Sequence, residues 1–304
     1  CVRADTHNQL LWSAERGKYV VITRGYTNSS PSVRVVAYME GLENLTSLKI
    51  LQEEKNTLGD GYWKTTTKYW SKPETVLDRY VTQDAQPYSM PILHASDGYY
   101  IGVVSVANFD KNTSGVWNSV HPELTWSPDG KNWQYIEKGT SFIPNAEEFV
   151  LEKGNDYGMI YCAAPVTVGD KTRIFYAAVP ELHYTNYSQI PEDIKQVVDE
   201  QIPAAKEAQS FTRTPTLNIA QFGKDRYAGY SAESGTVTTG PFKVWGENFK
   251  LTADVKEGGK LRIEVLNEKG KVIKGFEADS CAPIEGDVTD QVVIWKDKDF
   301  SDLK

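Results

Sequence analysis

A turn sequence within residues 122–136 constrains the fold more than any other feature of the chain. Two short apolar runs flank the tetrapeptide Ser127-Pro128-Asp129-Gly130. Proline presets φ for the first corner of a turn, aspartate hydrogen-bonds back to nearby backbone, and glycine accepts a positive φ. The sequence therefore predicts a β-hairpin. We expect Trp133 to pack over this turn and Asp129 to have a structural role, not a catalytic one.

Short β-like runs recur along the chain in four groups, which indicates an all-β protein. The runs lie at residues 8–12, 18–24 and 34–39; 88–94, 99–106, 124–127 and 133–137; 159–165 and 172–179; and 216–222 and 226–232. In each group an apolar strand is followed by a tight turn and a more aromatic strand. Recurring antiparallel units of this kind are typical of the blades of a β-propeller.

Two insertions separate these groups, and the second predicts a helix. The first, at 43–81, is polar and mixed, and the second covers about 188–209. Pro191 suits the first position of a helix, Glu192 and the next acid suit the positive end of its dipole, and Pro203 ends it. An apolar stripe at helical spacing consists of Ile194, Val197, Val198 and Ile202. We expect this helix to cover one side of the propeller; an amphipathic partner-binding helix is the alternative.

The pattern changes from residue 241 onward. Residues 249–255 and 260–266 alternate apolar and polar side chains, and 272–273 and 291–295 add further β-runs. This pattern predicts part of a β-sandwich, too short to close. The domains are therefore predicted at 1–240 and 241–304. Since both ends of the chain fall in patterned β-regions, we expect a fragment of a longer polypeptide; a lipoprotein cleaved before Cys1 is the alternative.

Composition excludes several classes of partner. The chain has 41 acidic and 33 basic residues and a net charge of −8, which argues against nucleic acid or an anionic membrane. Its three cysteines lie far apart and indicate neither a disulfide framework nor a metal site. No apolar run approaches the ~18 residues of a membrane span. The 17 Tyr, 10 Phe and 8 Trp suit β-sheets, and their flat faces also suit sugar rings.

Segments spread over most of the chain carry a resemblance to a known family. They are Asp5-Thr6-His7-Asn8, Gly17-Lys18-Tyr19, Thr23-Arg24, the turn at 127–133, the region from Tyr176 to His183-Tyr184, and residues 261–266, 270–276, 286–287 and 293–295. The chain resembles secreted bacterial proteins described as glycoside hydrolase family 32-like. The Ser-x-Asp-Gly-x-x-Trp turn also resembles a variant of the sialidase Asp-box of glycan-handling propellers. The family resemblance implies a five-bladed β-propeller, incomplete in this chain, followed by a β-sandwich.

The resemblance also implies carbohydrate processing in a secreted or periplasmic protein. It implies no particular bond, and the chain lacks the Trp-Met-Asn-Asp-Pro, Arg-Asp-Pro and Glu-Cys signatures of invertases, which argues against a β-fructosidase. No cofactor is expected; a Ca²⁺ ion at the propeller axis is conceivable by analogy, with no identifiable ligands. The expected partner is a carbohydrate.

Glycoside hydrolysis requires two carboxyl groups, one ionised and one protonated, facing a single bond. In a five-bladed propeller these groups lie where the inner strands converge, so acids that lead into inner strands are the candidates. Asp5 precedes the first such strand, Asp84 the second, and Glu148 lies in the loop before the third. We expect Asp5 to be one catalytic carboxylate and Asp84 or Glu148 its partner. Each has a structural alternative as a turn, cap or solvated loop acid.

The candidates for sugar binding are polar or aromatic residues near the same strands. They are His7, Asn8, Arg24, Trp117, His121 and His183. Arg24 and Arg34 suit a carboxylate on an acidic sugar, with pairing to a neighbouring acid as the alternative. The sequence thus predicts a glycosidase with a two-carboxylate mechanism, with a non-catalytic carbohydrate-binding protein as the alternative. A third interpretation is a structural segment of a larger catalytic assembly.

Overall fold

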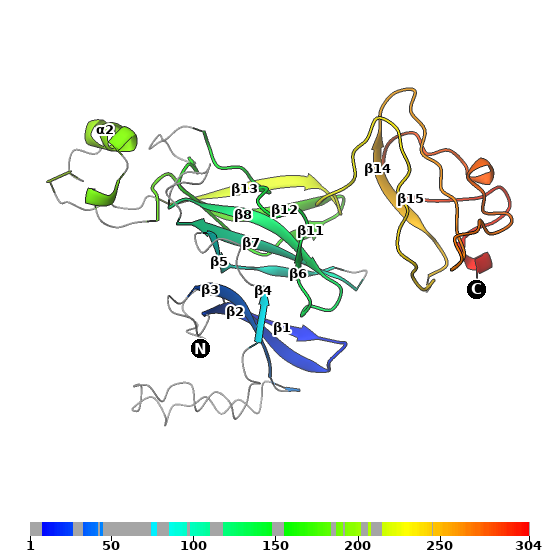
Figure 1. Ribbon diagram of the computed structural model, residues 1–304, viewed down its shortest axis with the longest axis horizontal. Helices are drawn as coiled ribbons and strands as arrows, with labels where there is room; N and C mark the ends of the chain where they lie inside the picture. Colours follow the sequence, from blue (N-terminus) through cyan, green and yellow to red (C-terminus); the bar gives the residue numbers. More distant parts are fainter. Residues whose placement is uncertain are drawn as a thin grey trace. The chain divides into compact units, whose positions relative to one another are not determined.

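The computed structural model describes residues 8–26, 33–41, 43–44, 74–77, 85–95, 98–109, 118–147, 155–183, 187–190, 192–201, 206–207, 215–244 and 246–303. Strands dominate this part of the chain, which confirms the all-β prediction (Figure 1). The chain divides into two compact units, the first comprising residues 1–168 and 173–221 and the second 169–172 and 222–304. The domain boundary expected at residue 241 stays a prediction.

The first unit begins with a four-stranded antiparallel sheet in chain order. Its strands are β1 (Gln9–Ser13), β2 (Lys18–Tyr26), β3 (Arg34–Glu40) and β4 (Glu74–Leu77) (Figure 1). The first three match the predicted runs. The fourth lies inside the segment that the sequence predicts to be an insertion, and it pairs with β3 from Val36↔Leu77 to Tyr38↔Glu74.

A nine-stranded sheet follows in the same unit. Its strands are β5 (Ala85–Ser89), β6 (Ile92–His94), β7 (Tyr100–Asn108), β8 (Val120–Ser127), β9 (Gln134–Tyr135), β10 (Met159–Cys162), β11 (Val166–Val168), β12 (Lys171–Val179) and β13 (Thr216–Gly223). The main path runs β11-β12-β10-β8-β7-β5, with β13 beside β12, β6 beside β7 and β9 beside β8. The second and third predicted groups are therefore real strand groups, joined by a parallel bridge at Met159↔Val120.

The predicted fourth group is wrong as a separate unit. Its first run forms β13, which pairs with β12, and residues 226–232 contain no strand. After the turn at Gly223, the Arg226 guanidinium donates to the carbonyl oxygen of Val288 at 3.0 Å and pairs with Asp287. The chain therefore joins the second unit instead of returning along β13. Both sheets are open among the described residues, so a five-bladed propeller stays a prediction.

The two sheets of the first unit share a hydrophobic core. Val20 and Ile22 of β2 and Val36 and Tyr38 of β3 pack with side chains in or beside the strands of the larger sheet, which are Met90, Ile92, Tyr100, Val104, Val106 and Trp133. Every one of them is less than one-tenth exposed. Burial of each large apolar side chain contributes about 1.5–3 kcal/mol. This core fixes where the ends of β2, β3 and β5 lie.

The turn at 127–130 has the predicted structure. Gly130 adopts φ 74°, and the Asp129 Oδ1 atom accepts backbone N–H groups from Lys131 at 2.9 Å and Asn132 at 2.7 Å. The buried Trp133 indole donates to the Gly130 carbonyl oxygen at 2.9 Å. Partial burial opposes the charge on Asp129, but the N–H donors outweigh it and lower its pKa to about 2. Asp129 thus organises the turn.

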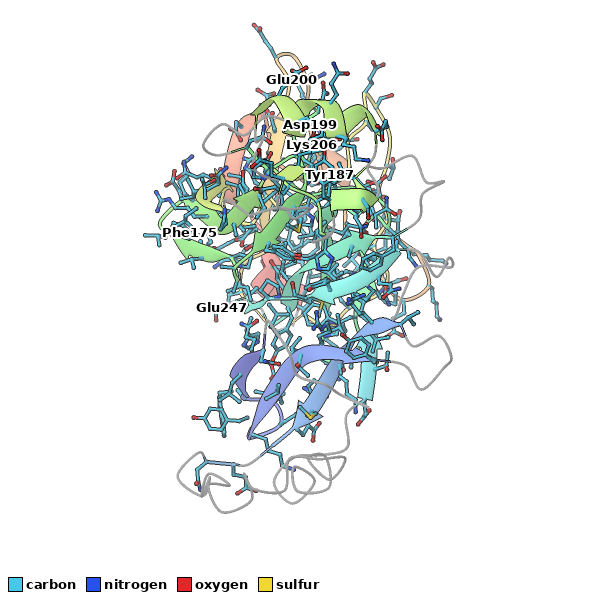
Figure 2. All side chains as sticks on the ribbon, turned by 90° about the vertical axis from the view of Figure 1, so that its left-hand side faces the viewer. Phe175, Tyr187, Asp199, Glu200, Lys206 and Glu247 are labelled. Carbon is cyan, nitrogen blue, oxygen red and sulfur yellow. The ribbon has the colours of Figure 1, made fainter. Side chains whose placement is uncertain are left out.

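The helix predicted in the second insertion forms as α2 (Glu192–Gln201). Its described range ends at Gln201, and Pro203, expected to end the helix because it lacks an N–H, lies outside the described residues. Figure 2 shows Asp199 near Tyr187 and Lys206. The Asp199 carboxylate accepts a hydrogen bond from the Tyr187 hydroxyl, and Lys206 Nζ lies 2.9 Å from Asp199 Oδ2. The apolar stripe falls on side chains outside the described set. No helix in the described part of the chain is long and apolar enough to cross a membrane.

The described residues of the second unit form a two-stranded antiparallel sheet, β14 (Lys250–Val255) with β15 (Gly286–Val292). The predicted strand at 260–266 instead makes single bridges, Leu261↔Ile284 and Leu266↔Val272. Positive φ at Gly258 and Gly270 places a turn on either side of this run. Trp295, fully buried, centres the core and donates to the Ile263 carbonyl oxygen at 2.8 Å. A β-sandwich stays a prediction.

Candidate functional site

The hairpin of β2 and β3 brings two arginines to one face. Tyr26 lies opposite Arg34 in the register, and Arg24 lies opposite Val36. Because side chains alternate along a strand, Arg24, Tyr26 and Arg34 share a face and are direct or diagonal neighbours. The Cζ atoms of Arg24 and Arg34 lie 5.6 and 6.0 Å from the centroid of the Tyr26 ring.

Strand β5 adds two residues at the two-residue spacing of one strand face, Gln86 and Tyr88. Gln86 Oε1 accepts hydrogen bonds from the Arg34 backbone N–H at 3.1 Å and from Arg34 Nη1 at 3.2 Å. The centroid of the Tyr88 ring lies 4.7 Å from Arg24 Cζ and 5.2 Å from Arg34 Cζ. Both guanidinium groups therefore contact the same tyrosine.

A histidine from a distant part of the chain completes the arrangement. His183 follows β12, and its Nε2 atom lies 3.1 Å from the Tyr88 hydroxyl. The His183 ring also contacts the Phe109 ring edge to face, with centroids 6.0 Å apart. The centroid of the Phe109 ring in turn lies 5.0 Å from Arg34 Cζ. We call these residues the arginine–tyrosine cluster: Arg24, Tyr26, Arg34, Gln86, Tyr88, Phe109 and His183.

Backbone contacts place His183 at this cluster. Its N–H donates to the Asn118 carbonyl oxygen at 2.8 Å, which ties the end of β12 to the start of β8. Nearby, the Gly158 N–H donates to Val179 O at 3.1 Å and the Gly158 carbonyl accepts from Val120 at 2.9 Å. A Cβ atom on Gly158 would collide with the carbonyl oxygen of Glu181. Only glycine permits this close backbone approach.

The cluster combines positive charge with aromatic surface. Arg24 is 2% exposed, whereas Tyr26, Arg34, Tyr88 and His183 are partly exposed. Guanidinium groups bind carboxylates and other oxyanions through paired N–H donors, and aromatic faces suit sugar rings as well as cations. Such a site is chemically suited to a polar ligand that carries hydroxyl or acidic groups.

The sequence candidates fall into three sets. Asp5, Asp84, Glu148, His7 and Trp117 lie outside the described residues, so their roles stay predictions. Arg24 and His183 both lie in the cluster. Asn8 and His121 contact other groups.

Asn8 accepts a hydrogen bond from the Thr23 hydroxyl. Since Thr23 and Arg24 are consecutive in β2, this contact lies on the opposite face of the strand from the cluster. The binding role expected of Asn8 stays a prediction.

His121 forms a pair with Glu123 on β8. Its Nε2 atom lies 2.9 Å from Glu123 Oε1, and the Gly139 N–H donates to Glu123 Oε2 at 3.0 Å. Burial lowers the pKa of His121 to about 4 and raises the pKa of Glu123 to about 7. Perturbed carboxyl groups of this kind occur in catalytic sites and in structural pairs alike. The binding role expected of His121 stays a prediction.

The cluster residues missed from the sequence are Tyr26, Gln86, Tyr88 and Phe109. Gln86 and Tyr88 closely follow Asp84, a sequence-predicted candidate, and their two-residue spacing was the available signal. Phe109 gave none, because a single aromatic after a buried strand is ordinary.

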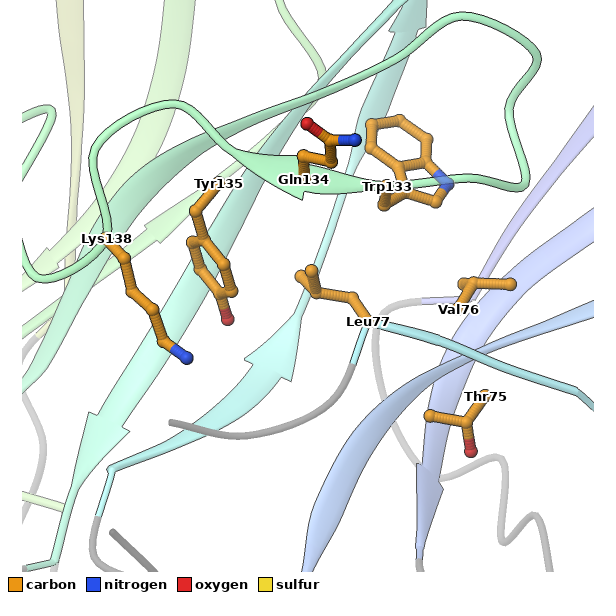
Figure 3. Close-up of a pocket in the computed structure, with 7 residues that line it drawn as sticks. All are labelled: Thr75, Val76, Leu77, Trp133, Gln134, Tyr135 and Lys138. Carbon is orange, nitrogen blue, oxygen red and sulfur yellow. The ribbon is translucent and has the colours of Figure 1, made fainter. Parts of the chain in front are cut away.

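A shallow hollow of about 330 Å³ lies elsewhere in the first unit, where β4 approaches β9 (Figure 3). Its lining comprises Thr75, Val76, Leu77, Trp133, Gln134, Tyr135 and Lys138. None of the sequence-predicted site residues lines it. No group of three potential metal ligands occurs among the described residues.

No protein-family model and no curated protein matches the sequence. Solved structures that are similar include a BT0996 RGII complex (TM-score 0.42, 11% identity, 78% of this chain and 49% of the other). A "Glycoside hydrolase" gives a TM-score of 0.41 at 11% identity over 78% of this chain and 49% of the other. An N-acetylgalactosamine deacetylase from F. plautii in complex with blood group B trisaccharide gives 0.42 at 14% identity, covering 74% and 52%. The chain thus spans about half the length of each, and likeness at this level establishes no shared activity.

Proposed function

We propose that this protein processes carbohydrate and that the arginine–tyrosine cluster is its sugar-binding site. In its finer form the proposal is a glycoside hydrolase in which Asp5 is one catalytic carboxylate and Asp84 or Glu148 the other. The supporting observation is that Arg24 and His183, selected separately from the sequence, both contact Tyr88.

The position of one predicted carboxylate in the sequence also supports this proposal. Asp84 immediately precedes β5, the strand that supplies Gln86 and Tyr88. Hydrolysis requires two carboxyl groups separated by roughly 5–10 Å, the shorter separation giving retention and the longer inversion.

The decisive experiment compares wild type with Asp5→Asn on a panel of polysaccharides and aryl glycosides. We expect wild type to release reducing ends and the variant to lose at least ~100-fold in turnover, because a neutral amide replaces a required carboxylate. Asp297→Asn is the matched control, since Asp297 is an exposed acid of the second unit. Full turnover by Asp5→Asn would remove Asp5 from the mechanism.

The alternative is a protein that binds carbohydrate without cutting it. The described side chains of the cluster are basic, aromatic or amide-bearing, a composition that suits binding. Saturable binding of a glycan by wild type, with no release of reducing ends from any substrate of the panel, would favour this alternative.

A further inference from the structure

We propose that the arginine–tyrosine cluster selects sugars that carry an anionic group, with Arg34 as the principal anion-binding residue and Arg24 beside it. This inference rests on the proposed function and names the class of ligand: acidic saccharides, above all those with a uronic acid carboxylate.

The first argument is the crowding of positive charge. Arg24 and Arg34 each lie within about 6 Å of the same two rings, those of Tyr26 and Tyr88. The two guanidinium groups together concentrate positive charge beside these rings. That charge attracts an anionic group, and a neutral sugar gains no such attraction.

The second argument concerns the edges of the Arg34 guanidinium group. Gln86 Oε1 accepts a hydrogen bond from Arg34 Nη1 at 3.2 Å. The Nε atom is buried and has no hydrogen-bond acceptor among the described residues. A buried guanidinium N–H without an acceptor is costly, which indicates that another group completes the site. Nε and Nη2 form the edge that carboxylates bind with two parallel hydrogen bonds.

The third argument is how firmly Arg34 is held. Gln86 fixes both its backbone N–H and its Nη1, while Phe109 lies 5.0 Å from its Cζ. Little side-chain freedom therefore remains to be lost on binding, which favours affinity. The Tyr88 hydroxyl with His183 adds polar groups for neighbouring sugar hydroxyls.

Calorimetric titration of the intact chain with a matched pair of ligands tests the proposal. The probes are a short oligogalacturonide and its full methyl ester, which differ only in charge, and a sulfated galactan oligosaccharide. We expect wild type to bind the acid at least tenfold more tightly than the ester. A preference for the sulfated probe over the uronide would support an anion site and assign its natural ligand to sulfated sugars.

Three variants separate charge from geometry. Arg34→Ala is expected to lose at least tenfold in affinity for the acid and to leave the ester unaffected. Arg34→Lys is expected to lose most of the same affinity, since lysine keeps the charge but not the fork. Arg173→Lys, on β12 where Arg173 bonds Gln221 at 2.8 Å, is the control and is expected to bind as wild type does.

Gln86→Glu keeps the proposal falsifiable if the Arg34 variants fail to fold. It places a carboxylate beside Arg34, so we expect an unimpaired thermal transition and weaker binding of the acid. Equal affinity of wild type for acid and ester would overturn the anion site but leave a sugar site standing. Failure to bind any acidic or neutral sugar would overturn the proposed function itself. Unchanged affinity for the acid in both Arg34→Lys and Gln86→Glu would remove Arg34 from the site.

Discussion

At the scale of single residues, Glu123 shows how burial controls a charge. Its side chain is fully buried between His121 and the Gly139 N–H, and burial raises its pKa to about 7 from an ordinary value of 4.5. At a pH between these two values, Glu123 keeps its proton in the folded protein and loses it in the unfolded chain. Raising the pH through this range therefore favours the unfolded state.

Glu123→Gln is predicted to remove this pH dependence. The amide stays neutral at every pH and can still accept from the Gly139 N–H, so the variant should gain stability relative to wild type as the pH rises from 4.5 to about 7. We expect a relative change on the order of 2 kcal/mol in the free energy of unfolding, measured by urea unfolding at about pH 5 and about pH 8.

The His121 contribution has the opposite sign, because its pKa of about 4 lies below its ordinary value of 6.5. His121 remains in the variant, so the difference between the two proteins reports on Glu123 together with its contact with His121. If the free energy of unfolding of wild type and variant changed in parallel between about pH 5 and about pH 8, the raised pKa of Glu123 would be refuted.

At the scale of elements, the β8–β9 hairpin depends on one carboxylate. Asp129 accepts the N–H groups of Lys131 and Asn132, and Gly130 lets the chain reverse directly against Tyr100. The Trp133 ring that packs over this turn also belongs to the core shared by the two sheets. A fault in the turn is therefore transmitted to the packing of the first unit.

Asp129→Ala is predicted to lower the free energy of unfolding by about 0.5–1.5 kcal/mol, because the turn N–H groups lose their carboxylate acceptor. The deficit should narrow as the pH falls from the ordinary aspartate value of 3.8 toward about 2, where wild-type Asp129 is itself protonated. Urea unfolding followed by tryptophan fluorescence measures both effects. Asp297→Ala serves as the surface control, and an Asp129→Ala protein as stable as this control would contradict the structural role.

At the scale of the whole molecule, the two units have separate hydrophobic cores. The core of the second is built from Phe276, Cys281, Ile284, Val293, Trp295 and Phe300. The arginine–tyrosine cluster belongs entirely to the first unit. Each unit can therefore lose its packing without directly removing a residue from the other's core.

Trp295→Ala is predicted to destabilise the second unit by about 3–5 kcal/mol, since it leaves a large cavity and an unpaired carbonyl at Ile263. Calorimetry should show two thermal transitions, of which only the one that belongs to the second unit is shifted to lower temperature. Binding of a sugar by the first unit should stay within about twofold of wild type. A single transition that shifts as a whole would show instead that the units unfold together.

The sequence by itself determined local structure, above all the turn at residues 127–130. Residues 127–130 specify their hairpin because proline, aspartate and glycine each act on adjacent backbone, and α2 follows from its own proline signals and first-turn acids. The recurring β-like runs determined the all-β class for the same reason, because each run depends on residues that are adjacent along the chain. The sequence also identified Arg24, Arg34 and His183, whose residue types suit contacts with sugars or with their acidic groups.

Only the tertiary structure decided which of these residues meet. Tyr88 joins Arg24 to His183 because hydrogen bonds at Gly158 and Asn118 bring the end of β12 beside β5, a contact between segments distant along the chain. The structure also overturned the predicted strand at 226–232, where Arg226 is bonded to Asp287 and Val288 of a distant segment. Turn residues act over three or four neighbours, whereas strand partners and site neighbours are chosen by burial and hydrogen bonds that form only when the whole chain packs.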